Sequence, residues 1–184
     1  MNIDAFFSEP LSEAFAMNGE ESDWLDVGTV TIQSSHISVG DAILFPGDQS
    51  EIEIDNGPYM IQAKGIDYGN DRRISRLRAC QIPVTIQSKR RNAISVVFAR
   101  VGICDPTLFL RALEANTNGG KDLDLYNAVY SDLLNAMYGV ITLDDQNMVF
   151  VSSGWGSGQY DVYELWLSGH SVGFEITFIN IDEE

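Results

Sequence analysis

The chain has 184 residues, an apolar content of 45% and a formal net charge of −16. This length suits a single domain that buries a core without metal or disulfide help, and the composition is that of a globular protein rather than a disordered one. No apolar run is long enough for a transmembrane helix, and the strong negative charge disfavours nucleic acid and anionic membranes as partners.

The charge is segmented along the chain. Residues 1–63 contain 12 acidic side chains and no Lys or Arg, residues 64–121 contain 11 basic and 4 acidic side chains, and residues 122–184 contain 11 acidic and no basic side chains. A surface of this kind attracts basic partners, and acidic inhibitors of basic nucleases use such surfaces to speed association. Two interpretations follow, solubility alone and a basic protein partner.

The N-terminal residues 1–23 are predicted to form an acidic segment with a short amphipathic helix interrupted at Pro10, ahead of a single β-rich domain at 24–184. The start of the chain lacks the positive region of a signal peptide, which favours a cytoplasmic location. Cys80 and Cys104 form no C-x-x-C pair, so we expect two buried thiols.

Strands are predicted from Trp24 onward, because apolar and polar residues alternate over 26–35 and 36–45. Strands at 51–54 and 59–66 follow, joined at 55–58 by an Asn-Gly step that suits a tight hairpin.

In the next strand, Arg76 and Arg78 are expected on one face and Leu77 and Ala79 on the other. The continuous apolar run at 93–103 is typical of a central strand.

Helices are predicted only in a two-helix insertion around residues 106–138. Asp105 and Pro106 mark a helix start, because Asp caps free N–H groups and Pro fits the first helical position. Strands at 148–152, 160–167 and 172–181 then close the chain, with a hairpin turn at 168–171. The predicted fold class is α+β and predominantly antiparallel β, either sandwich-like or a strongly bent sheet.

The most distinctive segment is SSGWGSGQYDVY at 152–163. It is no nucleophile elbow, because Gly156 stands where G-x-S-x-G needs serine, and neither a dinucleotide fingerprint nor a phosphate-binding loop fits. Alternation places Gly154, Gly156 and Gly158 on one side, where a neighbouring strand can approach closely, and Trp155 on the other side, toward the core or a pocket. We predict a structural lead-in to the strand that follows.

Two other constellations can be written from the sequence. Ser157, His170 and Asp161 have the residue types of a catalytic triad, but nothing in the sequence fixes the geometry that a triad requires. Asp144, Asp145, Asp161 and a histidine have the types of a metal site, but Asp144 and Asp145 are better explained by a hairpin turn. We therefore predict no catalytic residues, no metal and no cofactor.

Seven basic residues gather in the middle of the chain: Arg72, Arg73, Arg76, Arg78, Lys89, Arg90 and Arg91. The flanking segments are too acidic for these residues to dominate the field that a nucleic acid would meet. We expect them to pair with the chain's own acidic segments or to form one pole of a dipolar surface.

Residues 153–163 resemble the S-G-W-G-D-G-x-Y-x-V-Y signature of the bacterial domain-of-unknown-function family 4241, with Ser157 in place of the usual Asp. Segments 27–45 and 54–82 are similar to that family's opening pair of strands and its Arg-rich strand. The resemblance implies a mostly β domain without established catalytic residues. It marks as signature positions Gly154, Trp155, Gly156, Gly158, Tyr160 and Tyr163. In size and acidity, genes of this type resemble members of bacterial toxin–immunity loci.

Two functions are consistent with the sequence. The first is a non-enzymatic acidic binding protein, most concretely an immunity-type inhibitor of a bacterial toxin. The alternative is a small-ligand-binding or hydrolytic β domain with a pocket beside the Gly-Trp-Gly turn. The candidate contacts to a ligand or partner are Trp155, Asp161, Asp41 and Arg73.

Overall fold

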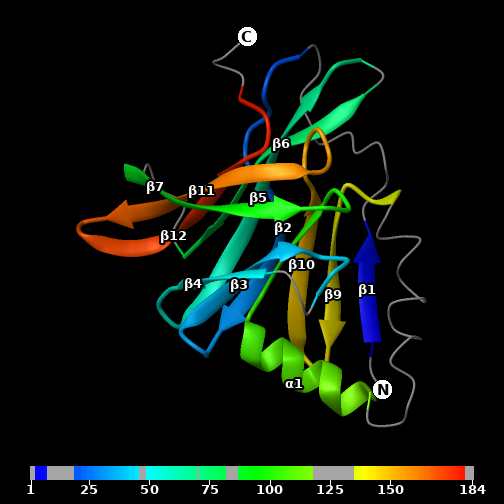
Figure 1. Ribbon diagram of the computed structural model, residues 1–184, viewed down its shortest axis with the longest axis vertical. Coiled ribbons are helices and arrows are strands. Elements are labelled where there is room, and N and C mark those ends of the chain that lie inside the picture. Colours follow the sequence, from blue (N-terminus) through cyan, green and yellow to red (C-terminus); the bar gives the residue numbers. More distant parts are fainter. Residues whose placement is uncertain are drawn as a thin grey trace.

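A computed structural model describes residues 3–7, 19–45, 49–69, 71–81, 87–117 and 135–180. In these residues, twelve strands form two antiparallel sheets that pack on each other, and one helix lies beside them (Figure 1). The predicted class, mostly antiparallel β in a sandwich-like arrangement, is confirmed.

The first sheet has six strands in the order β1-β9-β10-β8-β3-β4. Their bounds are β1 (Ile3–Phe7), β9 (Tyr138–Leu143), β10 (Gln146–Ser152), β8 (Arg100–Cys104), β3 (His36–Asp41) and β4 (Gln49–Glu53).

The second sheet has the order β2-β5-β6-β12-β11-β7. Its strands are β2 (Leu25–Ile32), β5 (Gly57–Asp67), β6 (Arg72–Cys80), β12 (His170–Thr177), β11 (Gly158–Leu167) and β7 (Gln87–Val96).

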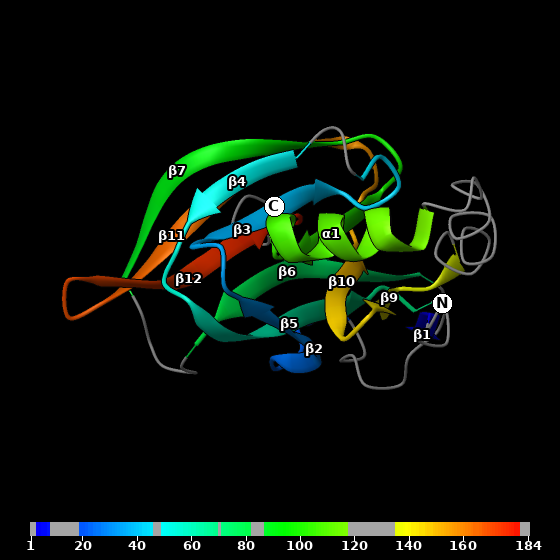
Figure 2. The ribbon, with the colours of Figure 1, turned by 90° about the horizontal axis from the view of Figure 1, so that it is seen from below.

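The main core lies between the sheets, where β2 packs on β9 and β10, and β3 packs on β7. In β6, Leu77 and Ala79 are buried in this core while Arg76 and Arg78 lie on the outer face, as the alternation predicts. Figure 2 shows α1 (Pro106–Thr117) beside the first sheet. A smaller apolar layer lies between this helix and the outer face of the sheet.

Asp105 caps α1 as predicted. Its Oδ1 accepts hydrogen bonds from the N–H groups of Thr107 and Leu108, both at 2.9 Å. The described residues contain this one helix rather than two, and β9 already begins at Tyr138. Most of the segment predicted to form the second helix, residues 122–139, lies outside the described residues.

Three predictions of local structure are wrong. Residues 3–7 form β1, paired with β9, rather than a helix. The turn after β4 is no hairpin, because β4 pairs with β3 and β5 with β2, in different sheets. The apolar run at 93–103 is not one strand, because β7 ends at Val96 and β8 begins in the other sheet. Hydrophobic periodicity shows which residues face a core but not which strands pair.

Both cysteines are free and buried, as predicted. Burial raises the pKa of the Cys80 thiol and of the Cys104 thiol, so both stay protonated at neutral pH. In the part of the chain that the structure describes, no helix is long and apolar enough to cross a membrane.

Candidate functional site

The Gly-Trp-Gly segment forms the turn between β10 and β11, and its own side chains close it. The Ser153 hydroxyl and the Tyr160 phenol each donate a hydrogen bond to the Gly156 carbonyl at 2.7 Å. The Gly156 N–H donates to the Ser153 carbonyl at 2.9 Å. The Tyr160 ring meets Phe178 edge to face, and burial raises the pKa of Tyr160, which keeps the phenol a neutral donor. The serine and tyrosine of the signature therefore fix this turn.

Two of the glycines are needed by the backbone. Gly154 has a φ of +55° and Gly156 a φ of +111°, conformations that other residues rarely adopt. A Cβ at position 154 would lie 2.9 Å from the Ile74 carbonyl oxygen, so the predicted close approach is confirmed there. At position 156 the nearest neighbour would be 3.9 Å away, so the backbone conformation alone favours glycine.

Trp155 is presented to solvent by this turn. Its side chain is 56% exposed, so it does not face the core, which was one of its two predicted directions. The alternation of a strand does not apply, because residues 153–157 precede β11. The Trp155 ring stacks on Tyr68 with centroids 5.5 Å apart, and the Arg73 guanidinium lies 5.4 Å from its centroid. Arg73 also donates to the Gly154 carbonyl at 3.1 Å, which ties the β5–β6 and β10–β11 turns together.

Asp41, a candidate contact residue, instead holds two further turns from within. It is only 1% exposed, and both of its carboxylate oxygens accept backbone hydrogen bonds. Oδ1 accepts from Ile43 at 2.9 Å and Leu44 at 3.3 Å, and Oδ2 accepts from Val97 and Phe98 at 2.7 Å each. The carboxylate therefore positions the β3–β4 and β7–β8 turns and does not itself face a partner.

These four turns lie at one end of the sandwich. Pairing of Asp41 with Val101, Ser152 with Arg100, and Gly158 with Val96 brings the corresponding strand ends to the same level. Figure 2 shows the turns after β3, β7 and β10 together at its right-hand side. The Ser157 hydroxyl also donates to the Val97 carbonyl, which joins the β10–β11 turn to the β7–β8 turn.

All the large apolar side chains that are exposed in the described residues belong to these turns. We call them the apolar rim: Leu44, Tyr68, Val97, Phe98 and Trp155. Exposed apolar side chains gathered in one place mark a binding surface more often than scattered ones do.

The remaining signature and contact candidates lie away from the rim. Asp161 and Tyr163 belong to β11, on the strand face opposite Tyr160 and Val162. Asp161 aligns with Ala93 of β7, so the structure does not bring it to the apolar rim.

The catalytic triad written from the sequence is not assembled. Ser157 precedes β11 and His170 follows it, so the two residues lie at opposite ends of this strand. Asp144 and Asp145 form the β9–β10 hairpin turn with φ of +45° and +66°, as predicted. Within the described ranges, no three His, Cys, Asp or Glu residues are placed to hold a metal ion.

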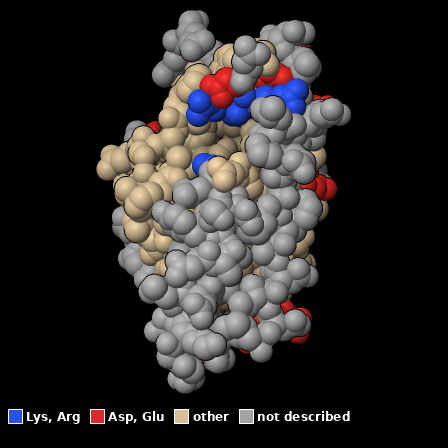
Figure 3. Space-filling view, turned by 90° about the vertical axis from the view of Figure 1, so that its right-hand side faces the viewer, with Lys and Arg blue, Asp and Glu red and all other residues tan. Residues whose placement is uncertain are grey.

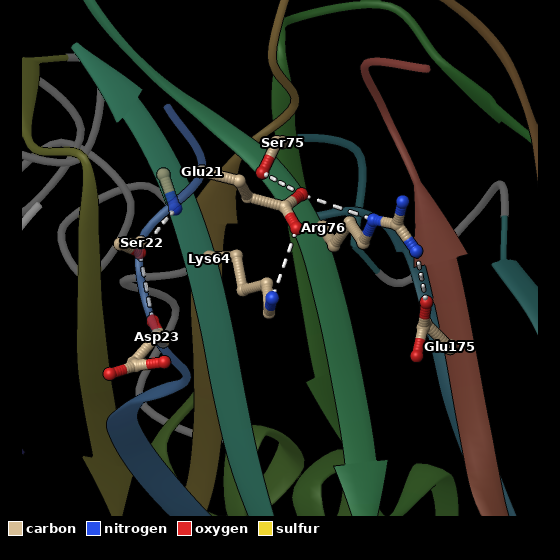
Figure 4. Close-up of polar contacts among 8 residues, drawn as sticks. Glu21, Ser22, Asp23, Lys64, Ser75, Arg76 and Glu175 are labelled. Atoms are coloured by element: carbon tan, nitrogen blue, oxygen red, sulfur yellow. Dashed lines mark hydrogen bonds and ion pairs between the residues drawn. The ribbon is translucent and has the colours of Figure 1, made fainter. Parts of the chain in front are cut away.

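Three of the seven basic residues, Arg72, Arg73 and Arg76, pair with acidic side chains of the same chain, as one of the two predictions stated, whereas Arg78 donates to Gln62. Figure 4 shows Glu21 between Lys64 and Arg76, at 3.0 Å and 3.1 Å, and Arg76 also reaches Glu175 at 3.4 Å. Two further pairs are Arg72–Asp67 and Arg73–Asp71, both at 2.8 Å. On the face in Figure 3, basic and acidic side chains lie next to one another near the top. The side chains of Lys89, Arg90 and Arg91 lie outside the described residues.

The sequence interpretation missed four of the five rim residues. Tyr68 had a signal, because a large aromatic residue before Gly69 in a polar turn has no core to enter. Val97 and Phe98 had none, because they lie inside a continuous apolar run and no Gly or Pro marks the turn. There Ala99 takes a positive φ of +58° instead.

Comparison with known proteins gives no match to a family model, to a curated protein or to a solved structure. The resemblance to family 4241 therefore stays a prediction.

Proposed function

We propose that this protein is a non-enzymatic acidic binding protein that captures a basic protein partner through the apolar rim. Its most concrete form is an immunity-type inhibitor of a bacterial toxin. The observation that carries the proposal is a cluster at one end of the sandwich, in which exposed Trp155 stacks on exposed Tyr68 and half-buried Arg73 lies against the Trp155 ring.

The chemistry of this cluster supports a protein partner. Trp, Tyr and Arg are the residue types that most often contribute large shares of binding energy at protein interfaces. The cluster is also preorganised, because stacking and the Arg73 hydrogen bond hold it before a partner arrives. Preorganisation lowers the entropy lost on binding.

The charge supports a basic partner. The net charge is −16, and the described basic side chains Lys64, Arg72, Arg73 and Arg76 are paired within the chain. The acidic excess therefore attracts basic proteins, and this attraction speeds association at low ionic strength.

The experiment measures binding of the full chain to a basic protein encoded beside its gene, with Trp155→Ala and Trp24→Ala as a matched pair. Trp24 also lies near basic side chains, with Arg78 4.0 Å from its ring centroid, but on the outer face of the second sheet. We expect Trp155→Ala to weaken binding by at least about 30-fold, the effect of removing a hot spot of 2 kcal/mol, and Trp24→Ala to weaken it little.

A salt titration completes the test, with lysozyme as a basic protein of unrelated structure. The expected association rate constant with the specific partner falls as salt rises, and lysozyme shows no dependence on Trp155. Equal effects of the two Trp variants, or binding indifferent to salt, contradict the proposal.

A further inference from the structure

The edge strand β4 of the first sheet has backbone groups that point away from its one neighbour, β3. The two strands pair antiparallel and in regular register, without a bulge. The Ile54 N–H donates to the Ser35 carbonyl at 3.1 Å, and the backbone groups of successive residues in a strand point to opposite sides. The N–H and carbonyl of Ile52 therefore face β3, and those of Glu51 and Glu53 face the open edge.

These outward-facing groups have no hydrogen-bond partner among the residues that the structure describes. No described backbone or side-chain group bonds to the N–H or the carbonyl of Glu51 or Glu53, and both residues are exposed. The edge strand β2 of the second sheet differs, because a bulge interrupts its pairing with β5 and the Asn147 side chain donates to its Thr29 carbonyl. A regular, unpaired edge such as β4 allows another extended chain to pair with it.

A cavity of about 300 Å³ lies beside this edge. Its apolar lining residues are Ile52 of β4, Val162 of β11 and Phe174 of β12. Val162 and Phe174 belong to the core between the sheets, and Ile52 packs against that core. The cavity therefore offers an apolar site for one side chain of a strand added to β4.

The charges on β4 select the sequence of such a strand. Side chains alternate along β4, so Glu51 and Glu53 lie on the face opposite Ile52. Residues directly opposite one another on paired strands share a face; opposite charges there are stabilising and like charges are destabilising. No Lys or Arg is among the described residues that line the cavity. Glu51 and Glu53 therefore disfavour an acidic strand and favour basic residues opposite them.

A second copy of this chain does not fit these requirements. Its own β4 would bring the same carboxylates close to Glu51 and Glu53, which is destabilising. The net charge of −16 also opposes association of the chain with itself. The complementary occupant is a basic segment of another protein.

We propose that β4 binds an extended segment of a partner protein in which two basic residues flank an apolar one. The segment pairs antiparallel with β4, its basic residues lie opposite Glu51 and Glu53, and its apolar residue lies opposite Ile52 and enters the cavity. Main-chain hydrogen bonds to β4 supply affinity and the alternate side chains supply specificity. The inference rests on this edge strand and not on the apolar rim, so it goes beyond the proposed function.

The test measures amide hydrogen exchange in the full ¹⁵N-labelled chain with the peptide acetyl-Val-Lys-Ile-Lys-Val amide. At a free peptide concentration about nine times its dissociation constant, about one site in ten is empty, so we expect exchange at Glu51 and Glu53 to slow about tenfold. The Ile52 amide is the internal reference. Its N–H faces β3 whether or not the peptide is bound, so its exchange should slow much less.

Two altered peptides separate strand pairing from general charge. N-methylation of both lysines removes their N–H donors and keeps both positive charges. We expect it to weaken binding at least about tenfold, the effect of losing two hydrogen bonds. Serine in place of the peptide isoleucine tests the cavity, and it should weaken binding about tenfold because less apolar surface is buried.

Variants of the chain give an independent test. Glu51→Gln should weaken the peptide about two- to fivefold, since one cross-strand charge pair is lost, and Asp145→Asn in the distant β9–β10 turn should leave its affinity unchanged. Glu51→Pro removes an N–H that faces away from β3, so the β3–β4 pairing remains possible. We expect Glu51→Pro to weaken the peptide at least about tenfold. If Glu51→Pro does not fold, the N-methylated peptide tests the same main-chain pairing.

Unchanged exchange at Glu51 and Glu53, equal binding of the N-methylated peptide, or an equal loss in Asp145→Asn overturns the inference. A loss of peptide affinity in Trp155→Ala also overturns it, because binding would then be at the apolar rim. If the peptide tests fail while capture of a basic partner still depends on Trp155, the inference is overturned and the proposed function stands.

Discussion

Trp155 stacks on Tyr68 with an interplanar angle of 27°, and the contact joins the turn after β10 to the turn after β5. Each of these turns also has hydrogen bonds of its own, so the stack adds to structure that already exists. The contact is therefore open to measurement as a coupling energy between two side chains.

We predict a coupling of about 0.5 to 1.5 kcal/mol between Tyr68 and Trp155, the range for aromatic pairs. Urea unfolding of Tyr68→Ala, Trp155→Ala and the double variant gives this value through a double-mutant cycle. The same cycle with Trp24 in place of Trp155 is the control, and its energies should add. Additive energies for the stacked pair would show that the contact does not stabilise the fold.

Asp41→Asn should lower the unfolding free energy by about 3 kcal/mol, because it breaks a buried network of hydrogen bonds to a charged carboxylate. The amide keeps one acceptor oxygen. Its NH₂ group replaces the other oxygen and cannot accept the hydrogen bonds that backbone N–H groups donate to Asp41 there. Denaturant unfolding measures the loss. Asp145→Asn, in an exposed turn, should change stability by less than about 0.5 kcal/mol. A loss at Asp41 no larger than that of the control would contradict the role given to its carboxylate.

Gly156→Val should destabilise the fold by about 2 kcal/mol, because valine disfavours the positive φ that this position requires. A thermal melt measures the effect. Gly158→Ala is the control, since Gly158 has no positive φ and a Cβ there makes only ordinary contacts. An unchanged melting temperature in Gly156→Val would refute the requirement for glycine.

Acid should loosen the turn that carries Tyr68. The side-chain hydrogen bond from Arg72, followed by the bond from the Gly69 N–H, lowers the pKa of Asp67 below its usual value. A carboxyl whose pKa is lower in the folded state stabilises the fold above its unfolded pKa, about 3.9, and this contribution is lost as the pH falls through the folded pKa.

Asp67→Asn should therefore make unfolding free energy less dependent on pH between about pH 5 and pH 2 than in the wild type. Chemical unfolding at a series of pH values measures this slope, and Asp145→Asn serves as the matched variant. If Asp67→Asn leaves this slope unchanged, the Asp67–Arg72 pair does not contribute to the pH dependence of the unfolding free energy.

Neither thiol should react in the folded protein, because burial raises the pKa of Cys80 and Cys104 and blocks access. Ellman's reagent at pH 8 should label both cysteines only after denaturant is added. Rapid labelling of one thiol under native conditions would show local opening at that strand.

Side-chain facing was predictable from the sequence, and strand pairing was not. Alternation placed Leu77 and Arg76 on the correct faces of β6, and the Asp105–Pro106 step located the start of α1. The continuous apolar run at 93–103 did not indicate that β7 and β8 belong to different sheets. That partition depends on contacts between distant strands, which also decide which turns meet at the rim.

The candidate site followed the same division. The resemblance marked the signature glycines and Tyr160, and Tyr160 and two of these glycines do hold the turn. Trp155 does not face the core, and Leu44, Val97 and Phe98 were missed. Their exposure results from the carboxylate of Asp41, which reaches backbone groups of a turn remote in sequence.

The reach of Asp41 has a consequence for when the binding surface exists. Asp41 and Val97 are 56 positions apart in the chain, so the rim is complete only after both sheets have formed and docked. A partner that recognises the rim binds the native state and not its unfolded or half-folded forms. At a free concentration 100 times its dissociation constant, such a partner adds about 2.7 kcal/mol to the native state by mass action. The abundance of this protein in a cell would then depend on the supply of its partner, with unbound copies unfolding and being degraded first.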